Sequence, residues 1–174
     1  MGKAILAAIV TLIVGYLGMV VGLEFLGKWV EFGLLIAIAV MGAWNYGVFD
    51  DDTAYDALDD LIESSKIISD MEKYFDAVIG AEYVDYDDGH YALVSAAVID
   101  SVLNDTQYSC DDEDYFKWIK TLKSFDFAPL KQKAIDAIDA VLSDSSEIKE
   151  LWEENEELYS AWREDKISMR ERLR

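Results

Sequence analysis

The chain has 174 residues, of which 35 are acidic and 15 basic, so its net charge is −20. That charge argues against nucleic-acid binding, which needs clustered Lys and Arg, and the 52% hydrophobic content argues against disorder. The single cysteine, Cys110, excludes an intramolecular disulfide and a multi-cysteine zinc site. Residues 1–44 carry no net charge, whereas residues 45–174 hold 13 basic and 33 acidic residues. We therefore expect a membrane-spanning part at 1–44 and an acidic domain at 45–174.

Residues 4–23 form a run of 20 residues without a formal charge. As an α-helix, such a run rises about 30 Å, which matches the hydrocarbon core of a bilayer. The run therefore predicts a transmembrane helix. A cleaved signal peptide is the alternative, because Lys3 suits the start of one, but the apolar run is long for that role and no A-x-A-like site follows it.

Small residues recur through this first span with spacings of four and three, which puts them on one helix face. In lipid, a smooth face lets another helix approach closely enough for dispersion contacts. We expect this stripe to pack against another helix, including one from a second copy of the chain, although Gly and Ala are also common in membrane helices generally. The small-residue stripe consists of Ala4, Ala8, Thr11, Gly15, Gly18 and Gly22.

A second apolar segment is shorter, because its uninterrupted part covers only residues 32–43. If Asn45 is tolerated, the span extends over about residues 30–48, with Trp29 and Trp44 suited to the two membrane interfaces. We expect a helical hairpin of two spans. The alternative is a single span followed by a re-entrant segment or one buried in the domain.

Lys3 and the terminal amine favour a cytoplasmic N-terminus under the positive-inside rule. Two spans would return the acidic domain to the cytoplasmic side of the plasma (inner) membrane, whereas a single span would place it outside. We expect the two-span arrangement, with membrane lipid around residues 1–44.

A distinctive pattern lies at the junction, where residues 41–56 read MGAWNYGVFDDDTAYD. It is similar to the G-A-W-G-x-G-x-F-x-x-D-x-A-x-D motif of the bacterial family called domain of unknown function 4259, and Asn45 stands where glycine is usual. The resemblance continues more loosely to residue 165. The family motif positions are Gly42, Trp44, Gly47, Phe49, Asp52, Ala54 and Asp56.

The resemblance implies a compact helical domain and supplies no catalytic residues. Such proteins usually begin at the methionine of the motif, so residues 1–40 look like an added membrane module. The family pattern also supports the alternative that Trp44 belongs to the core of the domain and not to the second span.

The acidic domain is expected to be all-α, with about six helices, because its apolar residues recur at helical spacing. Asp51, Asp52 and Thr53 suit the N-terminus of the first helix, and Gly80 suits the end of the second. The third follows a turn-rich loop at residues 85–89 and is apolar enough to form the core. The expected helices cover about residues 51–63, 67–79, 91–102, 111–122, 129–142 and 145–162, and a short basic helix covers 166–174.

No catalytic, cofactor or metal site is predicted. Asp52, Asp56, Asp59, Asp60 and Glu63 crowd one helix face and offer oxygen ligands to a divalent cation, but a solvated helix face explains them more simply. His90 and Cys110 lie in no catalytic motif, and the acidic neighbours of the thiol predict a raised pKa for Cys110. We expect the tryptophans with helical spacing to lie in the core, namely Trp118, Trp152 and Trp162.

We therefore expect a membrane-anchored domain, not an enzyme, that binds a protein partner in a regulatory or immunity-like role. A strongly acidic domain attracts basic partner proteins and repels nucleic acid. One alternative is a carboxylate-based domain that binds divalent cations or acts as a metal-dependent enzyme. Another is a structural subunit of a membrane complex that packs through the small-residue stripe.

The uncharged run leads to a test of membrane anchoring. The full chain should sediment with membranes and resist extraction by alkaline carbonate, because the run at 4–23 would be inserted in the bilayer. A truncated chain that begins at Asn45 should remain in the supernatant. Release of the full chain by carbonate would contradict the transmembrane prediction.

Overall fold

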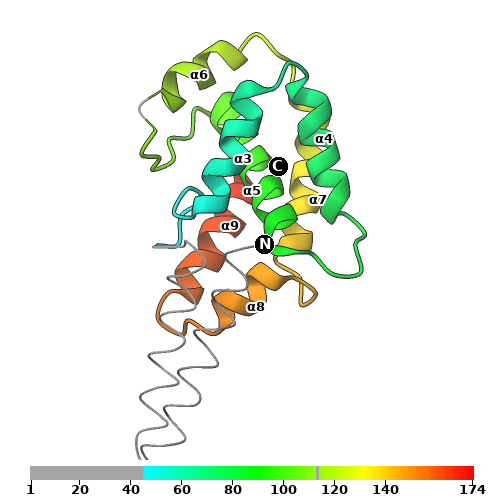
Figure 1. Cartoon of the computed structure of the whole chain (residues 1–174), viewed down its shortest axis with the longest axis vertical. Helices are drawn as coiled ribbons and strands as arrows, with labels where there is room; N and C mark the ends of the chain where they lie inside the picture. The colour runs from blue at the N-terminus through cyan, green and yellow to red at the C-terminus, as the bar shows by residue number, and fades with distance from the viewer. Residues whose placement is uncertain (1–44, 113) are drawn as a thin grey trace, which may run out of the picture. The chain divides into compact units, whose positions relative to one another are not determined.

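The computed structural model describes residues 45–112 and 114–174, and the acidic domain at 45–174 forms one compact unit. The all-α prediction is confirmed for these residues (Figure 1). None of the helices between residues 45 and 174 combines the length and the apolar character that a membrane crossing needs. The first predicted span, most of the second, the small-residue stripe, Gly42 and Trp44 lie outside the described residues.

The described residues contain seven α-helices and one short 3-10 helix. In chain order they are α3 (Asp52–Glu63), α4 (Ile67–Val78), α5 (Tyr86–Asn104), α6 (Tyr115–Leu122), η2 (Ala128–Leu130), α7 (Lys131–Val141), α8 (Glu147–Glu153) and α9 (Tyr159–Leu173).

Local sequence signals set several helix ends as predicted. Asp51 caps α3, because its side chain accepts a hydrogen bond from the backbone N–H of Thr53 at 2.8 Å. Gly80 follows α4 with φ +75°, a left-handed conformation that glycine adopts without steric cost. Pro129, at the start of the predicted helix 129–142, lies in the first turn of η2, where its missing N–H costs nothing, and α7 follows from Lys131.

Helix α5 forms the centre of the domain, as its apolar sequence predicts. Every residue from Ala92 to Ser101 is buried, and α5 packs against α3, α4, α6, α7, α8 and α9. Figure 1 shows α3, α4 and α7 around it. A helix buried on all its faces must satisfy its own polar side chains inside the core, so the polar residues of α5 need particular partners.

The prediction of a loop at residues 85–89 is wrong, because α5 already begins at Tyr86. The acidic residues there suit the positive N-terminal end of a helix. Gly89 is buried inside the helix, where a Cβ atom would lie 2.6 Å from Cδ1 of Ile148. The glycine therefore permits the close approach of α8 to α5.

The predicted helix at 145–162 is in fact two helices, which raises the count above six. Helix α8 ends at Glu153, and α9 begins at Tyr159 and continues through the basic tail to Leu173. Between them, the side chain of Asn155 accepts a hydrogen bond from the backbone N–H of Leu158 at 3.1 Å. Such a local side-chain bond offers the backbone an alternative to the helix.

The second predicted span does not reach residue 48 as a helix. Residues 45–50 form bends and turns, and Val48 and Phe49 are buried in the core of the acidic domain. Their apolar side chains, which extended the predicted span, are there because they fill the interior of this domain.

An ion pair between buried Asp100 and partly exposed Arg172 fixes α9 against the C-terminal part of α5. Asp100 is fully buried and accepts hydrogen bonds from Arg172 Nε at 2.8 Å and from Tyr108 Oη at 2.6 Å. Asn104 donates to the other carboxylate oxygen of Asp100 at 2.8 Å and to the backbone oxygen of Arg172 at 2.9 Å. The carboxylate therefore has both a counter-charge and hydrogen bonds, which a buried charge requires.

Replacing Arg172 by Met should lower the free energy of unfolding by about 3 kcal/mol, because it leaves Asp100 buried without its counter-charge. Urea unfolding of the chain that begins at Asn45, followed by tryptophan fluorescence, measures the loss. Arg174 is the matched control, since its ion pair with Glu171 is exposed. Arg174→Met should cost less than about 1 kcal/mol. Equal losses in the two variants would contradict this account of the buried pair.

Candidate functional site

The family motif forms a tight turn at the start of the acidic domain. Within it, the backbone N–H of Gly47 donates to the carboxylate of Asp50 at 2.9 Å, and the N–H of Asp50 donates to the Gly47 oxygen at 3.4 Å. A Cβ atom at position 47 would lie 2.6 Å from the Asp50 carboxylate oxygen. The turn therefore requires the small residue that the motif has at this position.

Phe49 places the turn in the core. Its ring is buried and packs edge-on against Tyr115, with centroids 5.1 Å apart, and against Tyr108 at 6.1 Å. Tyr108 also donates a hydrogen bond to Asp100. The same tyrosine therefore contacts both Phe49 of the motif turn and the carboxylate that pairs with Arg172. Ala54 is buried on α3, whereas Asp52 and Asp56 are exposed.

Asp51 brings a second buried carboxylate beneath the turn. Besides capping α3, it accepts a short hydrogen bond from the hydroxyl of Tyr86, and its Oδ1 lies 3.9 Å from Nε2 of His90. The hydroxyl pKa of Tyr86 is raised, chiefly by burial and then by the bond to Asp51. Asp51 thus joins the start of α3 to the first turns of α5.

His90 is held in its neutral form. Its pKa is lowered from 6.5 to about 4, chiefly by burial; the Asp51 carboxylate opposes this shift and the Lys166 ammonium adds to it. Among the described residues, neither ring nitrogen of His90 has a hydrogen-bond partner. An imidazole in this state has lost its water without gaining full compensation, so its protonation state is coupled to the stability of the fold.

Lys166 connects the turn to α9. It is almost fully buried, and its ammonium donates to the backbone oxygen of Tyr46 and to the Asp165 carboxylate, both at 2.8 Å. Burial lowers the pKa of this lysine. We call the set Asp51, Tyr86, His90 and Lys166 the junction cluster, because it attaches the turn that follows residue 44 to both α5 and α9.

The sequence analysis placed Lys166 in a short basic helix at 166–174 and did not predict its burial. Spacing was the available signal: Trp162, Lys166, Met169 and Leu173 are four, three and four residues apart, and all are buried on one face of α9. A lysine inside such a stripe occupies a core position.

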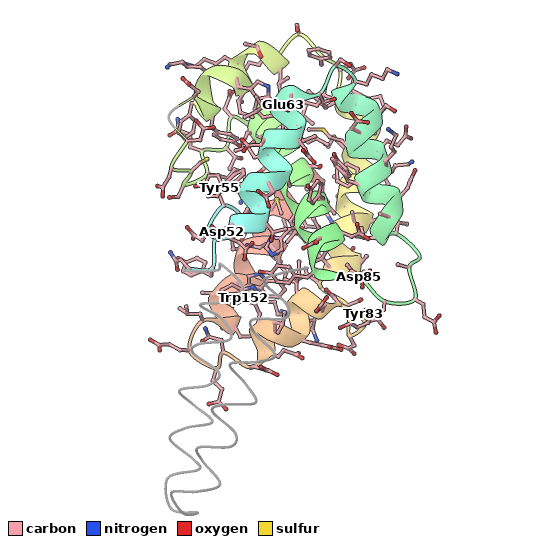
Figure 2. All side chains as sticks on the ribbon, viewed as in Figure 1. Asp52, Tyr55, Glu63, Tyr83, Asp85 and Trp152 are labelled. Atoms are coloured by element: carbon pink, nitrogen blue, oxygen red, sulfur yellow. The ribbon has the colours of Figure 1, made fainter. Side chains whose placement is uncertain are left out.

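The other residues considered for chemistry do not converge. All five carboxylates of the α3 face are exposed, as Figure 2 shows for Asp52 and Glu63 at the two ends of the helix. In the described part of the chain, no group of three or more His, Cys, Asp or Glu side chains is arranged to hold a metal ion.

Cys110 is half-buried, and its neighbours are not those of His90. The thiol pKa is raised, chiefly by burial; hydrogen bonds from the Asp112 backbone and Tyr55 lower it, and the charges of Asp112 and Asp111 raise it by less. The predicted direction is therefore confirmed, although burial contributes more than the acidic neighbours do. A thiol with a raised pKa is a poor nucleophile.

A surface of aromatic and acidic side chains lies where α8 meets α9. The buried ring of Trp162 stacks on Trp152 at 5.9 Å with a 13° interplanar angle, and on Tyr159 at 6.0 Å and 22°. Trp152, labelled in Figure 2, and Tyr159 are partly exposed, so the core prediction holds fully only for Trp162. Trp118 is also only partly buried. The exposed carboxylates of this acidic aromatic surface are Glu153, Glu154, Glu156 and Glu157.

The family model described as a domain of unknown function, DUF4259, matches residues 42–165. The chain therefore belongs to this family. The match begins at the turn that the junction cluster holds and includes Asp51, Tyr86 and His90, but it ends one residue before Lys166. No curated protein and no solved structure matches the chain significantly.

The junction cluster leads to a pH dependence of stability. The folded pKa of His90 lies below its unfolded value of 6.5. The unfolded chain therefore binds more protons, and stability present above pH 6.5 is lost as the pH falls toward 4. The free energy of unfolding should drop by about 2 kcal/mol between about pH 7 and about pH 5.

His90 is the only histidine of the chain, so few other groups titrate in this window. His90→Gln is the control, because it keeps a polar side chain that does not titrate. Urea unfolding of the chain that begins at Asn45, measured across the same pH range, should show a much flatter profile for this variant. An unchanged slope would show that His90 is not the group responsible.

Proposed function

We propose that this protein is a membrane-anchored interaction module whose acidic domain binds a partner protein that presents basic side chains, in a regulatory or immunity-like role. The uncharged run at 4–23 supports the anchor. The acidic aromatic surface at α8 and α9 supports the interaction, and this surface is the observation on which the proposal rests.

Trp152 and Tyr159 suit a binding surface because they are large, rigid and already stacked against Trp162. Tryptophan and tyrosine are the residues that most often dominate the energy of protein interfaces. Preformed stacking also reduces the side-chain entropy that binding would cost.

The carboxylates around these rings set the chemistry of the partner. Glu153, Glu154, Glu156 and Glu157 are exposed, and only Glu153 has an ion pair among the described residues, with Lys149 at 2.7 Å. A lysine or arginine of a partner would meet free carboxylates there and aromatic faces suited to cation–π contact. The net charge of the chain would accelerate the approach of such a partner.

A photo-crosslinking amino acid in place of Ser160, an exposed residue beside Tyr159, would test the partner hypothesis in the full chain. We expect one specific adduct in intact membranes. Replacing Glu153, Glu154, Glu156 and Glu157 by Gln should reduce the yield of this adduct about tenfold, because the acidic aromatic surface would lose its negative charge and its attraction for a basic partner.

The matched control removes the same number of carboxylates from α3, by changing Asp56, Asp59, Asp60 and Glu63 to the corresponding amides. This variant should retain the adduct. Equal loss in both variants would mean that only total charge matters, and no loss in either would show that the α8–α9 surface does not bind the partner.

The anchor has a topological consequence. Two spans would return the acidic domain to the cytoplasm, where the N-terminus lies. With Cys110 replaced by Ala, a cysteine at Gly27 should react with an impermeant maleimide added to intact cells, whereas a cysteine at Arg174 should react only after lysis. Labelling of position 174 in intact cells would reject the hairpin and the cytoplasmic location together.

A further inference from the structure

Helix α6 and the end of α5 enclose a hollow on the opposite side of the domain from α8. The hollow measures about 260 Å³ and is lined by Phe116, Ile119, Lys120, Lys123, Thr106 and Gln107, among others. Phe116 is 39% exposed although it is a large apolar residue. Pockets for small molecules are usually larger, about 300–1,000 Å³, so this hollow suits a single large side chain.

The hollow is slightly basic, although the chain as a whole carries −20. Its charged lining residues are Lys120 and Lys123 against one acidic residue, Asp105. Lys117 pairs with Asp114 at 2.7 Å and Lys123 pairs with Asp105. Lys120 is exposed and has no ion pair with any described residue. The rim of the hollow therefore has a lysine available for a carboxylate.

An exposed tyrosine lies in a strongly acidic loop at the other end of the domain. Tyr83 is 44% exposed, lies between α4 and α5 and donates a hydrogen bond to Glu150 at 2.9 Å. Its neighbours Glu82 and Asp85 are exposed, and no Lys or Arg occurs between residues 74 and 116. We call residues 82–85 the Tyr83 loop.

The Tyr83 loop is held in position before any partner arrives. The backbone N–H of Val84 donates to the Ser145 oxygen at 2.8 Å, and the N–H of Glu147 donates to the Val84 oxygen at 3.0 Å. The buried side chain of Val84 fixes the loop from below. An anchor residue on a preformed loop loses little conformational entropy on binding.

The Tyr83 loop and the α6 hollow cannot meet within one chain. Figure 2 shows Tyr83 and Asp85 beside α8, whereas Figure 1 shows α6 at the opposite end of the domain. We propose that they meet between two copies of the chain, with Tyr83 of one copy inserted into the α6 hollow of the next. The carboxylates around Tyr83 then face Lys120.

Because the two surfaces differ, this contact is heterologous, and any assembly that does not close into a ring has one free loop and one free hollow at its ends. The contact is expected to be weak, since two chains of −20 repel each other at distances that salt does not screen. The same net charge disfavours an anionic membrane as the occupant of the hollow, and a flat bilayer would not require a pocket for one side chain.

Site-directed crosslinking in the full chain tests the proposal. In a Cys110→Ala background, cysteines replace Glu82 beside the loop tip and Gln107 in the wall of the hollow, so that Tyr83 and Lys120 are kept. A short bismaleimide is added to isolated membranes. The chain with both cysteines should give dimers, trimers and longer products, and a mixture of the two single-cysteine chains should give dimers only.

Each single-cysteine chain alone should give no product, because a head-to-tail contact never brings two equivalent positions together. Dimers from Glu82→Cys or Gln107→Cys alone would indicate a symmetric contact and overturn the proposal. Absence of product in the mixture would also overturn the proposal. So would protection of the cysteine at position 107 from the maleimide by anionic vesicles alone, because it would indicate a lipid occupant.

Exchanging the charges of Lys120 and Glu150 provides a second test of the contact. Lys120→Glu or Glu150→Lys alone should lower the yield of crosslinked product about fivefold, which corresponds to the loss of about 1 kcal/mol for an exposed ion pair. Both changes together should restore it. Lys73→Glu on α4 makes the same change in net charge as Lys120→Glu and should have no effect. Failure of the double variant to recover would reject the pairing of the Tyr83 loop with the α6 hollow.

Discussion

The burial of α5 on all its faces from Ala92 to Ser101 is the constraint on which the rest of the domain depends. A helix that is covered on all faces needs neighbours on every side, and six other helices supply them. It also carries His90, Ser95, Asp100 and Ser101 into the interior, where each polar group needs compensation. Arg172 of α9 supplies it for Asp100 and Tyr115 of α6 for Ser101, whereas Ser95 bonds to a backbone oxygen of α5 itself. His90 has only the Asp51 carboxylate nearby, at 3.9 Å.

The sequence was most informative where apolar spacing or a capping residue determined the structure. The central position of α5, the cap at Asp51 and the helix end at Gly80 were predicted, because each depends on residues that are close in sequence. The loop assigned to residues 85–89 was wrong because Gly89 serves a packing contact with Ile148, which is 59 positions away in the printed sequence and gives no local signal.

The contacts within the junction cluster could not have been predicted from the chain alone, although apolar spacing marks Lys166 as a core position. Asp51 was identified as a cap, but its contacts with Tyr86 and His90 depend on how α3 approaches α5. Charged residues are normally taken as exposed, which is why Lys166 was missed. The motif was found because its residues are contiguous, and the structure supplies physical roles for two of its positions: Gly47 closes a turn and Phe49 fills the core.

The pairing of Asp100 with Arg172 has a consequence for biosynthesis. The two residues are 72 positions apart, so at about 5–20 residues per second a ribosome needs on the order of 4–14 s to supply the counter-charge. Until then the nascent domain has a carboxylate near the C-terminal end of α5 that cannot be buried without a cost in free energy. The acidic domain should therefore remain open during most of its synthesis and close as one cooperative unit when α9 arrives, which makes this interval the one in which chaperones have access to its core.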